Sequence, residues 1–114
     1  MCHKKAQLGS NAGLAHVVVT GFAVENANFE GILVQSASLV TIWGDHVLDN
    51  DQSLVSSSAM CPGPPGFETS EPNDCGEGIH LMGVDHSTVA DNVVERNAGG
   101  ILVTDETAAN HDND

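Results

Sequence analysis

The residues best suited to chemistry lie close together in the second half of the chain. Asp74, Glu77 and His80 bring two carboxylates and one imidazole within seven residues, at the end of a long loop. A carboxylate beside an imidazole can transfer protons or ligate a divalent ion. Glu77 and His80 are therefore the candidate catalytic pair. The alternative is that the carboxylates accept hydrogen bonds from loop amides and that His80 is an exposed side chain without a role.

Further carboxylates follow the apolar run at residues 100–103. Asp105 and Glu106 come after this run, and we expect them near the same face of the molecule as the catalytic pair. Together with Asp74 they form a candidate calcium site, because Ca²⁺ prefers oxygen ligands. Asp105 is also a candidate substrate-binding residue. The acidic tail at residues 110–114 could hold a cation, but a truncated turn is the favoured interpretation.

The chain contains one tryptophan, Trp43. We predict that Trp43 faces outward from its strand, where an indole can stack on a sugar ring. It is therefore a candidate substrate-binding residue. The proline-rich loop that follows could instead fold over the indole and bury it, and we favour this alternative.

The charge balance excludes several partners. Sixteen acidic residues against three Lys and Arg give a formal charge of −13. With so few basic side chains to neutralise phosphates, neither nucleic acid nor an anionic membrane surface is an expected partner. The charge would attract cations where carboxylates converge, or it could serve only to keep the protein soluble. No apolar stretch approaches the ~20 residues that a membrane-spanning helix needs.

An internal repeat indicates which elements position these residues. One block reads as a short alternating strand, a polar corner, an apolar residue and an Asn-rich turn, and it occurs at residues 17–26, 40–50 and 88–97. A shorter block begins with Gly-Ile and occurs at residues 31–34, 78–81 and 100–103. The runs are rich in β-branched residues and too short for helices. Short strands are therefore predicted throughout.

The spacing of the blocks gives the period. Val19 and Ile42 are 23 residues apart, and the last two Gly-Ile blocks are 22 apart. Gly31 and Gly78 are 47 apart, which is about two periods, so extra chain lies between them. We interpret residues 51–75 as a loop inserted into one coil, because its prolines cannot supply central strands.

A period near 22 with several short strands predicts a parallel sheet wound into coils, in which equivalent residues stack along the axis. Alternation predicts that the interior holds Val40, Ile42, Val47, Ile79, Leu81, Ile101 and Val103, with Ile32 and Val89 in the same stacks. It predicts that the outward side chains are Thr41, Trp43, His46, His80 and Leu102. The glycine that opens each Gly-Ile block is expected to allow a sharp entry into its strand.

The blocks Thr-Val/Ile-x-Gly/Asp-Asn/Asp-x-Val-x-x-Asn, followed by Gly-Ile-x-Leu/Val, resemble the β-helix repeats of the pectate-lyase-like superfamily over residues 16–107. The resemblance implies an all-β, right-handed parallel β-helix (solenoid) of about three coils with one long inserted loop. It also implies a secreted or periplasmic bacterial protein that binds or processes carbohydrate. The motifs of polygalacturonases and epimerases do not occur, and Arg96, the only Arg, is predicted to be a surface residue. The resemblance is thus more specific for fold than for activity.

The expected organisation has three parts. They are an irregular N-terminal segment at 1–15, β-helix coils at 16–109 with the insertion at 51–75, and a truncated tail at 110–114. A polysaccharide-binding or polysaccharide-processing protein is the leading hypothesis, with calcium as its one candidate cofactor. The alternative is a non-catalytic structural or adhesin-like scaffold. Carboxylates converging with His80 over an open groove would favour a lyase, hydrolase or epimerase, whereas a covered face would favour the scaffold.

The cysteines and the coil ends give two further predictions. Cys61 and Cys75 bracket the proline-rich part of the insertion, and a disulfide there would close a 15-residue loop and contribute roughly 3 kcal/mol. Two free thiols are the alternative. The open ends of the coil stack would expose unpaired strand edges, so self-association is expected.

Overall fold

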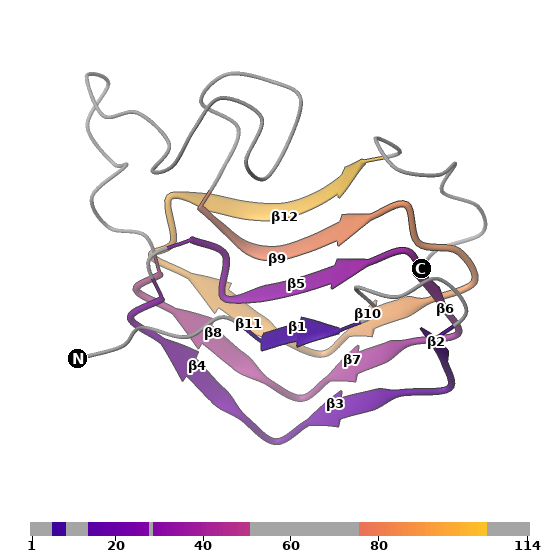
Figure 1. Ribbon diagram of the computed structural model, residues 1–114. Helices are drawn as coiled ribbons and strands as arrows, with labels where there is room; N and C mark the ends of the chain where they lie inside the picture. Colours follow the sequence, from indigo (N-terminus) through magenta and orange to yellow (C-terminus); the bar gives the residue numbers. More distant parts are fainter. Residues whose placement is uncertain (1–5, 9–13, 28, 51–75, 105–114) are drawn as a thin grey trace.

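The computed structural model describes residues 6–8, 14–27, 29–50 and 76–104 (Figure 1). These residues form an all-β structure without helices, and 60% of them lie in strands. The described part of the chain therefore offers no helix that is long and apolar enough to cross a membrane. The predicted insertion at 51–75 and the tail at 110–114 lie outside the described residues.

The described residues form short strands that pair in parallel. In chain order these are β1 (Ala6–Leu8), β2 (Leu14–Ala15), β3 (Val18–Thr20), β4 (Ala23–Glu25), β5 (Ile32–Gln35), β6 (Ala37–Ser38), β7 (Thr41–Trp43), β8 (His46–Leu48), β9 (Glu77–Met82), β10 (Thr88–Ala90), β11 (Val93–Glu95) and β12 (Gly99–Thr104). Their sheets have the orders β1-β5-β9-β12, β10-β7-β3, β11-β8-β4 and β2-β6. The predicted parallel strand direction is confirmed.

The chain visits these sheets in the same order each time, and we call one such run a pass. The first pass is β1 to β4, and the second is β5 to β8. The third runs from β9 to β11, with Asp85 bridging to Ser38 where the other passes have β2 and β6. β12 pairs with β9 and begins a fourth pass. Each strand therefore lies beside its equivalent from a neighbouring pass, as the stacked arrows of Figure 1 show.

The pairing registers confirm the block alignment made from the sequence. Ile42 pairs with Val19 on one side and with the third-pass valine Val89 on the other. Ile79 pairs with Ile32 and with Ile101 in the same way. The period of the sequence repeat is therefore the stacking period of the structure.

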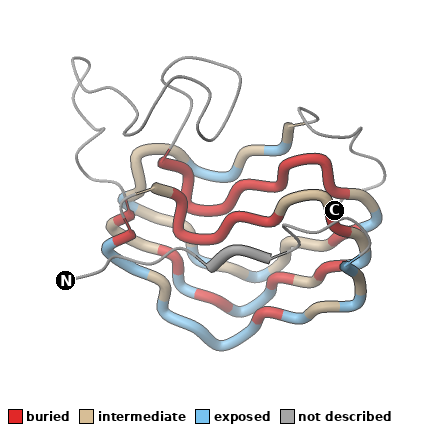
Figure 2. Tube along the Cα trace, viewed as in Figure 1, coloured by how far each residue is buried: buried red, intermediate tan, exposed pale blue. Residues whose placement is uncertain are grey.

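The core is a stack of aliphatic side chains enclosed by the sheets (Figure 2). Its buried members are Val19, Ile32, Val34, Ala37, Val40, Ile42, Val47, Ile79, Leu81 and Val84. The interior positions predicted in β7, β8 and β9 are thus confirmed, whereas Val89 is only partly buried. At roughly 1.5–3 kcal/mol per buried aliphatic side chain, this stack is the main favourable term in folding.

The prediction that Ile101 and Val103 are buried is wrong. They are 52% and 49% exposed, although Ile101 is in register with the buried Ile79. β12 is the outermost strand of its sheet in the described structure, so its side chains pack against a neighbouring pass on one side only. Alternation sets the direction of a side chain but does not provide the layer that covers it.

The N-terminal segment 1–15 differs from its predicted irregular structure. It contributes β1 and β2, which pair with β5 and β6 respectively. Their sequences, Ala-Gln-Leu and Leu-Ala, contain no β-branched residue. Pairing with the second pass, rather than local propensity, therefore explains these strands.

Each pass bends at corners where one residue adopts a left-handed backbone conformation. The equivalent corner sets are His16, Leu39 and His86; Gly21, Gly44 and Asp91; and Asn26, Asp49 and Arg96. A left-handed conformation costs roughly 1–2 kcal/mol for a residue other than Gly. Because it recurs at the same place in each pass, the stacking of passes must compensate for this cost.

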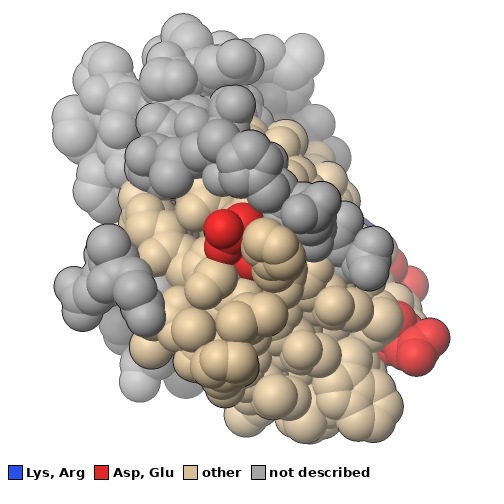
Figure 3. Space-filling view, turned by 90° about the vertical axis from the view of Figure 1, so that its right-hand side faces the viewer, with Lys and Arg blue, Asp and Glu red and all other residues tan. Residues whose placement is uncertain are grey.

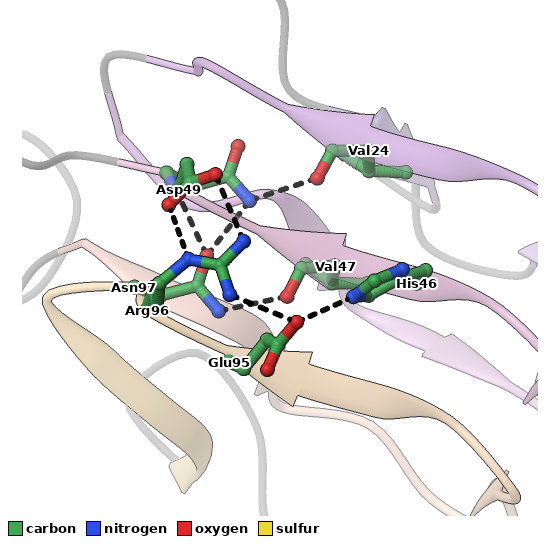
Figure 4. A network of polar contacts seen from close by, with 8 residues as sticks. Val24, His46, Val47, Asp49, Glu95, Arg96 and Asn97 are labelled. Atoms are coloured by element: carbon green, nitrogen blue, oxygen red, sulfur yellow. Dashed lines mark hydrogen bonds and ion pairs between the residues drawn. The ribbon is translucent and has the colours of Figure 1, made fainter.

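Amide side chains connect the corners of successive passes. Asn50 accepts a hydrogen bond from Ala27 N at 3.0 Å and donates one to Val24 O at 3.0 Å. Asn97 repeats the pattern one pass later, accepting from Asn50 N and donating to Val47 O, both at 3.0 Å (Figure 4). The Asn-rich turns recognised in the sequence therefore connect neighbouring passes by hydrogen bonds, and we call each such connection an amide joint.

Gly31 and Gly78 open their blocks for a reason other than the predicted sharp entry. A Cβ on Gly31 would lie 2.6 Å from Val47 Cγ1, and a Cβ on Gly78 would lie 2.5 Å from Val94 Cγ1. Neither glycine has a positive φ. The close approach of valine and asparagine side chains, not backbone freedom, therefore favours glycine at both positions.

Candidate functional site

Glu30, Glu77 and His80 form a buried group with ligand atoms within 4.8 Å of one another. His80 Nδ1 lies 3.3 Å from Glu30 Oε1 and 3.9 Å from Glu77 Oε2. Glu30 and His80 are fully buried, and Glu77 is 7% exposed. The structure brings Glu77 and His80 together, and Glu30 joins them. We call these three residues the Glu–Glu–His group.

The repeat places the two glutamates at equivalent positions of adjacent passes. Glu30 and Glu77 each precede the glycine of a Gly-Ile block, and the offset between them is the one that pairs Ile32 with Ile79. Gly31 N donates to Glu77 O at 3.0 Å, which ties the two passes together at this point. The carboxylates are therefore stacked along the axis.

His80 is held from its other side by β12. Its Nε2 lies 2.9 Å from Thr104 Oγ1, and this contact leaves Nδ1 directed at the carboxylates. In the next pass Gly99 pairs with Glu77, and a Cβ there would lie 3.2 Å from Glu77 Cγ. A larger residue at Gly99 would therefore displace the Glu77 side chain from the group.

The prediction that His80 is exposed is wrong. By alternation it lies on the side of β9 opposite to Ile79 and Leu81, as predicted, yet it is fully buried. All six residues of β9 are buried, and Leu33, which pairs with His80, is only 4% exposed. The face over His80 is therefore covered rather than open, which is the arrangement expected of a scaffold. A catalytic role for the pair stays a hypothesis.

The remaining predicted ligands lie outside the described residues. They are Asp74, Asp105 and Glu106 for calcium, with Asp105 also for substrate, and Cys61 and Cys75 for the disulfide. These assignments stay predictions.

Trp43 lies on a different sheet from the Glu–Glu–His group. It belongs to β7, between Thr20 of β3 and Ala90 of β10 in the ladder. Trp43 is 48% exposed. The outward direction is confirmed, whereas the loop expected to cover the indole lies outside the described residues.

The outward positions around Trp43 carry no charged side chain. The outward positions of β3, β7 and β10, which we call the tryptophan face, are Val18, Thr20, Thr41, Trp43, Thr88 and Ala90. Thr20 and Ala90, which pair with Trp43 from the two neighbouring strands, have small side chains and leave the indole ring accessible. Threonine hydroxyls beside it can donate and accept hydrogen bonds.

A polar network covers the adjoining sheet of β8 and β11 (Figure 4). Arg96 contacts Asp49 through two bonds, of 2.9 and 3.3 Å, and contacts Glu95 at 3.1 Å. His46 Nε2 lies 2.9 Å from Glu95 Oε1. The hydrogen bond from Arg96 lowers the pKa of Asp49, and the hydrogen bond from His46, with the charge of Arg96, lowers the pKa of Glu95. The predicted surface positions of His46 and Arg96 are confirmed, and both residues take part in joining passes.

Acidic residues do not form one continuous patch on the side of the molecule seen in Figure 3. Among the described atoms there, the Asp and Glu side chains form small separate groups within a surface that is neither acidic nor basic.

No family model matches the chain, and neither a curated protein nor a solved structure matches it. The evidence for function is therefore the fold together with the two candidate sites, the Glu–Glu–His group and the tryptophan face.

Sequence reasoning missed Glu30 and Thr104. Glu30 carried a detectable signal, because it precedes Gly31 just as Glu77 precedes Gly78. Thr104 carried a weaker one, because it ends the strand equivalent to that of His80. The repeat aligned glycines and aliphatic residues, and extending the alignment by one residue would have paired the glutamates.

Proposed function

We propose that the chain forms a right-handed parallel β-helix of about three coils that binds carbohydrate through its tryptophan face. Four ladders visited in a fixed order, together with left-handed corners that recur at equivalent places, support the wound arrangement. A right-handed path is supported by the strong preference of parallel crossover connections for that hand.

The exposed Trp43 is the observation that carries the binding proposal. An indole stacks on the apolar face of a sugar ring, and the threonines of the same face supply hydrogen bonds to ring hydroxyls. Outward positions that span three paired strands suit an extended chain better than a single sugar. A neutral oligosaccharide is the preferred ligand, because a charge of −13 repels uronates. A secreted or periplasmic location is part of this proposal.

Binding is favoured over processing because the acid–base candidates are elsewhere. Glu77 and His80 lie on the sheet of β9, are buried, and contact each other rather than solvent. The outward ladders around Trp43 contain Val, Thr and Ala, none of which is a general acid or base.

Titration of the protein with neutral oligosaccharides of increasing length, followed by calorimetry and by the fluorescence of the one tryptophan, tests the proposal. Trp43→Ala should weaken binding at least about tenfold, which corresponds to about 1.4 kcal/mol, and Trp43→Phe should retain part of it. His46→Ala, on the adjoining sheet, is the matched control and should bind as wild type. Equal affinities for wild type and Trp43→Ala would refute the site.

A structural scaffold is the second candidate, and the burial of both faces of β9 favours it. In that case the oligosaccharide panel gives no binding at all, while the fold remains stable in all three variants.

A further inference from the structure

We infer that the Glu–Glu–His group is a structural binding site for a divalent transition metal of the zinc type, which joins the second and third passes, because Glu30 precedes β5 and because Glu77 and His80 lie in β9. The inference is independent of carbohydrate binding, because the group and Trp43 lie on different sheets. Its ligands are Glu30, Glu77 and His80 Nδ1.

His80 Nδ1 and Glu30 Oε1 form a long hydrogen bond, and the separations between the ligand atoms also suit a metal ion. Charge-assisted N–H···O bonds are about 2.7–2.9 Å long, whereas His80 Nδ1 is 3.3 Å from Glu30 Oε1 and 3.9 Å from Glu77 Oε2. Bonds of about 2.0–2.1 Å to a tetrahedral Zn²⁺ place two ligand atoms about 3.3 Å apart. The separation between His80 Nδ1 and Glu30 Oε1 meets this value. Glu77 Oε2 would have to move about half an ångström closer to His80 Nδ1 to meet it.

The stacking of the glutamates gives an independent reason for a cation between them. Like charges at paired positions of adjacent strands repel each other, and burial increases the repulsion. Glu30 and Glu77 occupy equivalent positions of adjacent passes and are almost fully buried, so a cation that contacts both carboxylates would lower this repulsion.

His80 indicates the class of metal, and its second ring nitrogen shows how the imidazole ring is held in place. Calcium takes six to eight oxygen ligands, while imidazole with carboxylates suits zinc and its neighbours. A metal-bound histidine usually donates its other ring N–H to an acceptor that fixes the ring. Thr104 Oγ1, at 2.9 Å from Nε2, occupies that position as a positioning residue.

The neighbouring residues in the same ladder show that a histidine is not required for packing. His80 pairs with Leu33 in one direction and with Leu102 in the other. Leucine therefore fits this position in both adjacent passes. His80→Leu is consequently a substitution that the fold should tolerate, and it removes only the nitrogen ligand.

The first test is metal binding by the full chain after treatment with EDTA. Calorimetry with Zn²⁺ should give one site per chain, Ca²⁺ should give none at the same concentration, and Zn²⁺ alone should raise the melting temperature. Co²⁺ should give the visible absorption of a four-coordinate ion without the near-ultraviolet thiolate band that would report cysteine ligation. Absence of Zn²⁺ binding at millimolar concentration, or a thiolate band, would overturn the assignment.

Variants then locate the ion. Glu30→Gln and His80→Leu should each weaken Zn²⁺ binding about 100-fold or more, and Thr104→Val about 10-fold, since supporting residues typically contribute 10–100-fold. His46→Leu and His86→Leu are matched controls, because these exposed histidines also lie beside carboxylates, Glu95 and Asp85. Loss of binding in the controls but not in Glu30→Gln would assign the ion to the surface and refute the buried site.

Discussion

Replacing Asn50 with alanine removes the central member of the amide joint between passes. Asn50 is fully buried, and its side chain makes three hydrogen bonds: from Ala27 N at 3.0 Å, to Val24 O at 3.0 Å and to Asn97 Oδ1 at 2.9 Å. Asn97 Oδ1 keeps a partner in the variant, because it also accepts from the backbone of residue 50. The groups that lose this partner are Ala27 N–H and Val24 C=O.

The cost follows from those two groups. A buried polar group left without its partner costs about 1–3 kcal/mol. Ala27 is 4% exposed and Val24 is partly buried, so a loss of about 2–4 kcal/mol is expected for the pair. A chain of this size typically has about 6–17 kcal/mol of unfolding free energy. The variant should therefore fold but lose a large share of its stability.

Urea unfolding followed by circular dichroism measures the effect. For an m value of about 2 kcal/mol/M, the midpoint should fall by roughly 1–2 M. Thr20→Ala, at an exposed position of β3, is the control and should change the unfolding free energy by less than about 1 kcal/mol. If Asn50→Ala is no less stable than Thr20→Ala, the amide joint does not hold the passes together.

Three further predictions follow from the structure. Gly78→Ala should cost about 1–3 kcal/mol by overpacking, whereas Gly100→Ala, where a Cβ meets no atom within 4 Å, should be nearly neutral; equal urea midpoints would contradict this. Because the pKa values of Asp49 and Glu95 are lowered from 3.8 and 4.5, both carboxylates stabilise the fold above those values. That contribution is lost as the pH falls through the lowered values, and Arg96→Ala should flatten the decline in urea midpoint between pH 6 and pH 2; parallel profiles for variant and wild type would refute it. Self-association through strand edges should increase with ionic strength, because salt screens the charge of −13, and light scattering that finds a monomer at both low and high salt would contradict it.

The repeat could be predicted from sequence because its signal is local. Alternation and a constant spacing identified the partners of Ile42 and Ile79 before any contact was known. Their burial follows because each has a neighbouring pass on both sides. Ile101 carries the same local signal but has a neighbouring pass on one side only. Position in the stack, which a repeat unit does not encode, decides between burial and exposure.

The candidate site was predicted in part for a related reason. Alternation placed His80 on the outer side of β9 and put Glu77 within reach of it. Whether an outer side faces solvent depends on what covers the sheet, and no property of residues 78–81 reports that. Glu30 is distant in sequence and becomes a neighbour only through stacking. The sequence therefore predicted an exposed catalytic pair, whereas the structure has a buried group of three side chains.

The amide joints lead to a last prediction, at Asp45. Asn92 accepts from Asp45 N at 2.9 Å and donates to Ile42 O at 2.9 Å, the same pattern as Asn50 and Asn97. Asp45 occupies the equivalent place one pass earlier and accepts from Phe22 N at 2.8 Å. A carboxylate cannot supply the donor, and Asp45 Oδ2 is buried without a hydrogen-bond partner in the described structure.

Asp45→Asn should complete that joint. An amide nitrogen in place of Oδ2 can donate to the carbonyl three residues before Phe22, as Asn92 donates to the carbonyl three residues before Asp45. The substitution removes a 2% exposed carboxylate and adds about one hydrogen bond, so stability should rise by about 1–3 kcal/mol. Asp91→Asn, which removes the same charge from an exposed corner, is the control for the change in net charge. An Asp45→Asn midpoint that is at or below that of wild type would show that the carboxylate is bound by something other than this joint.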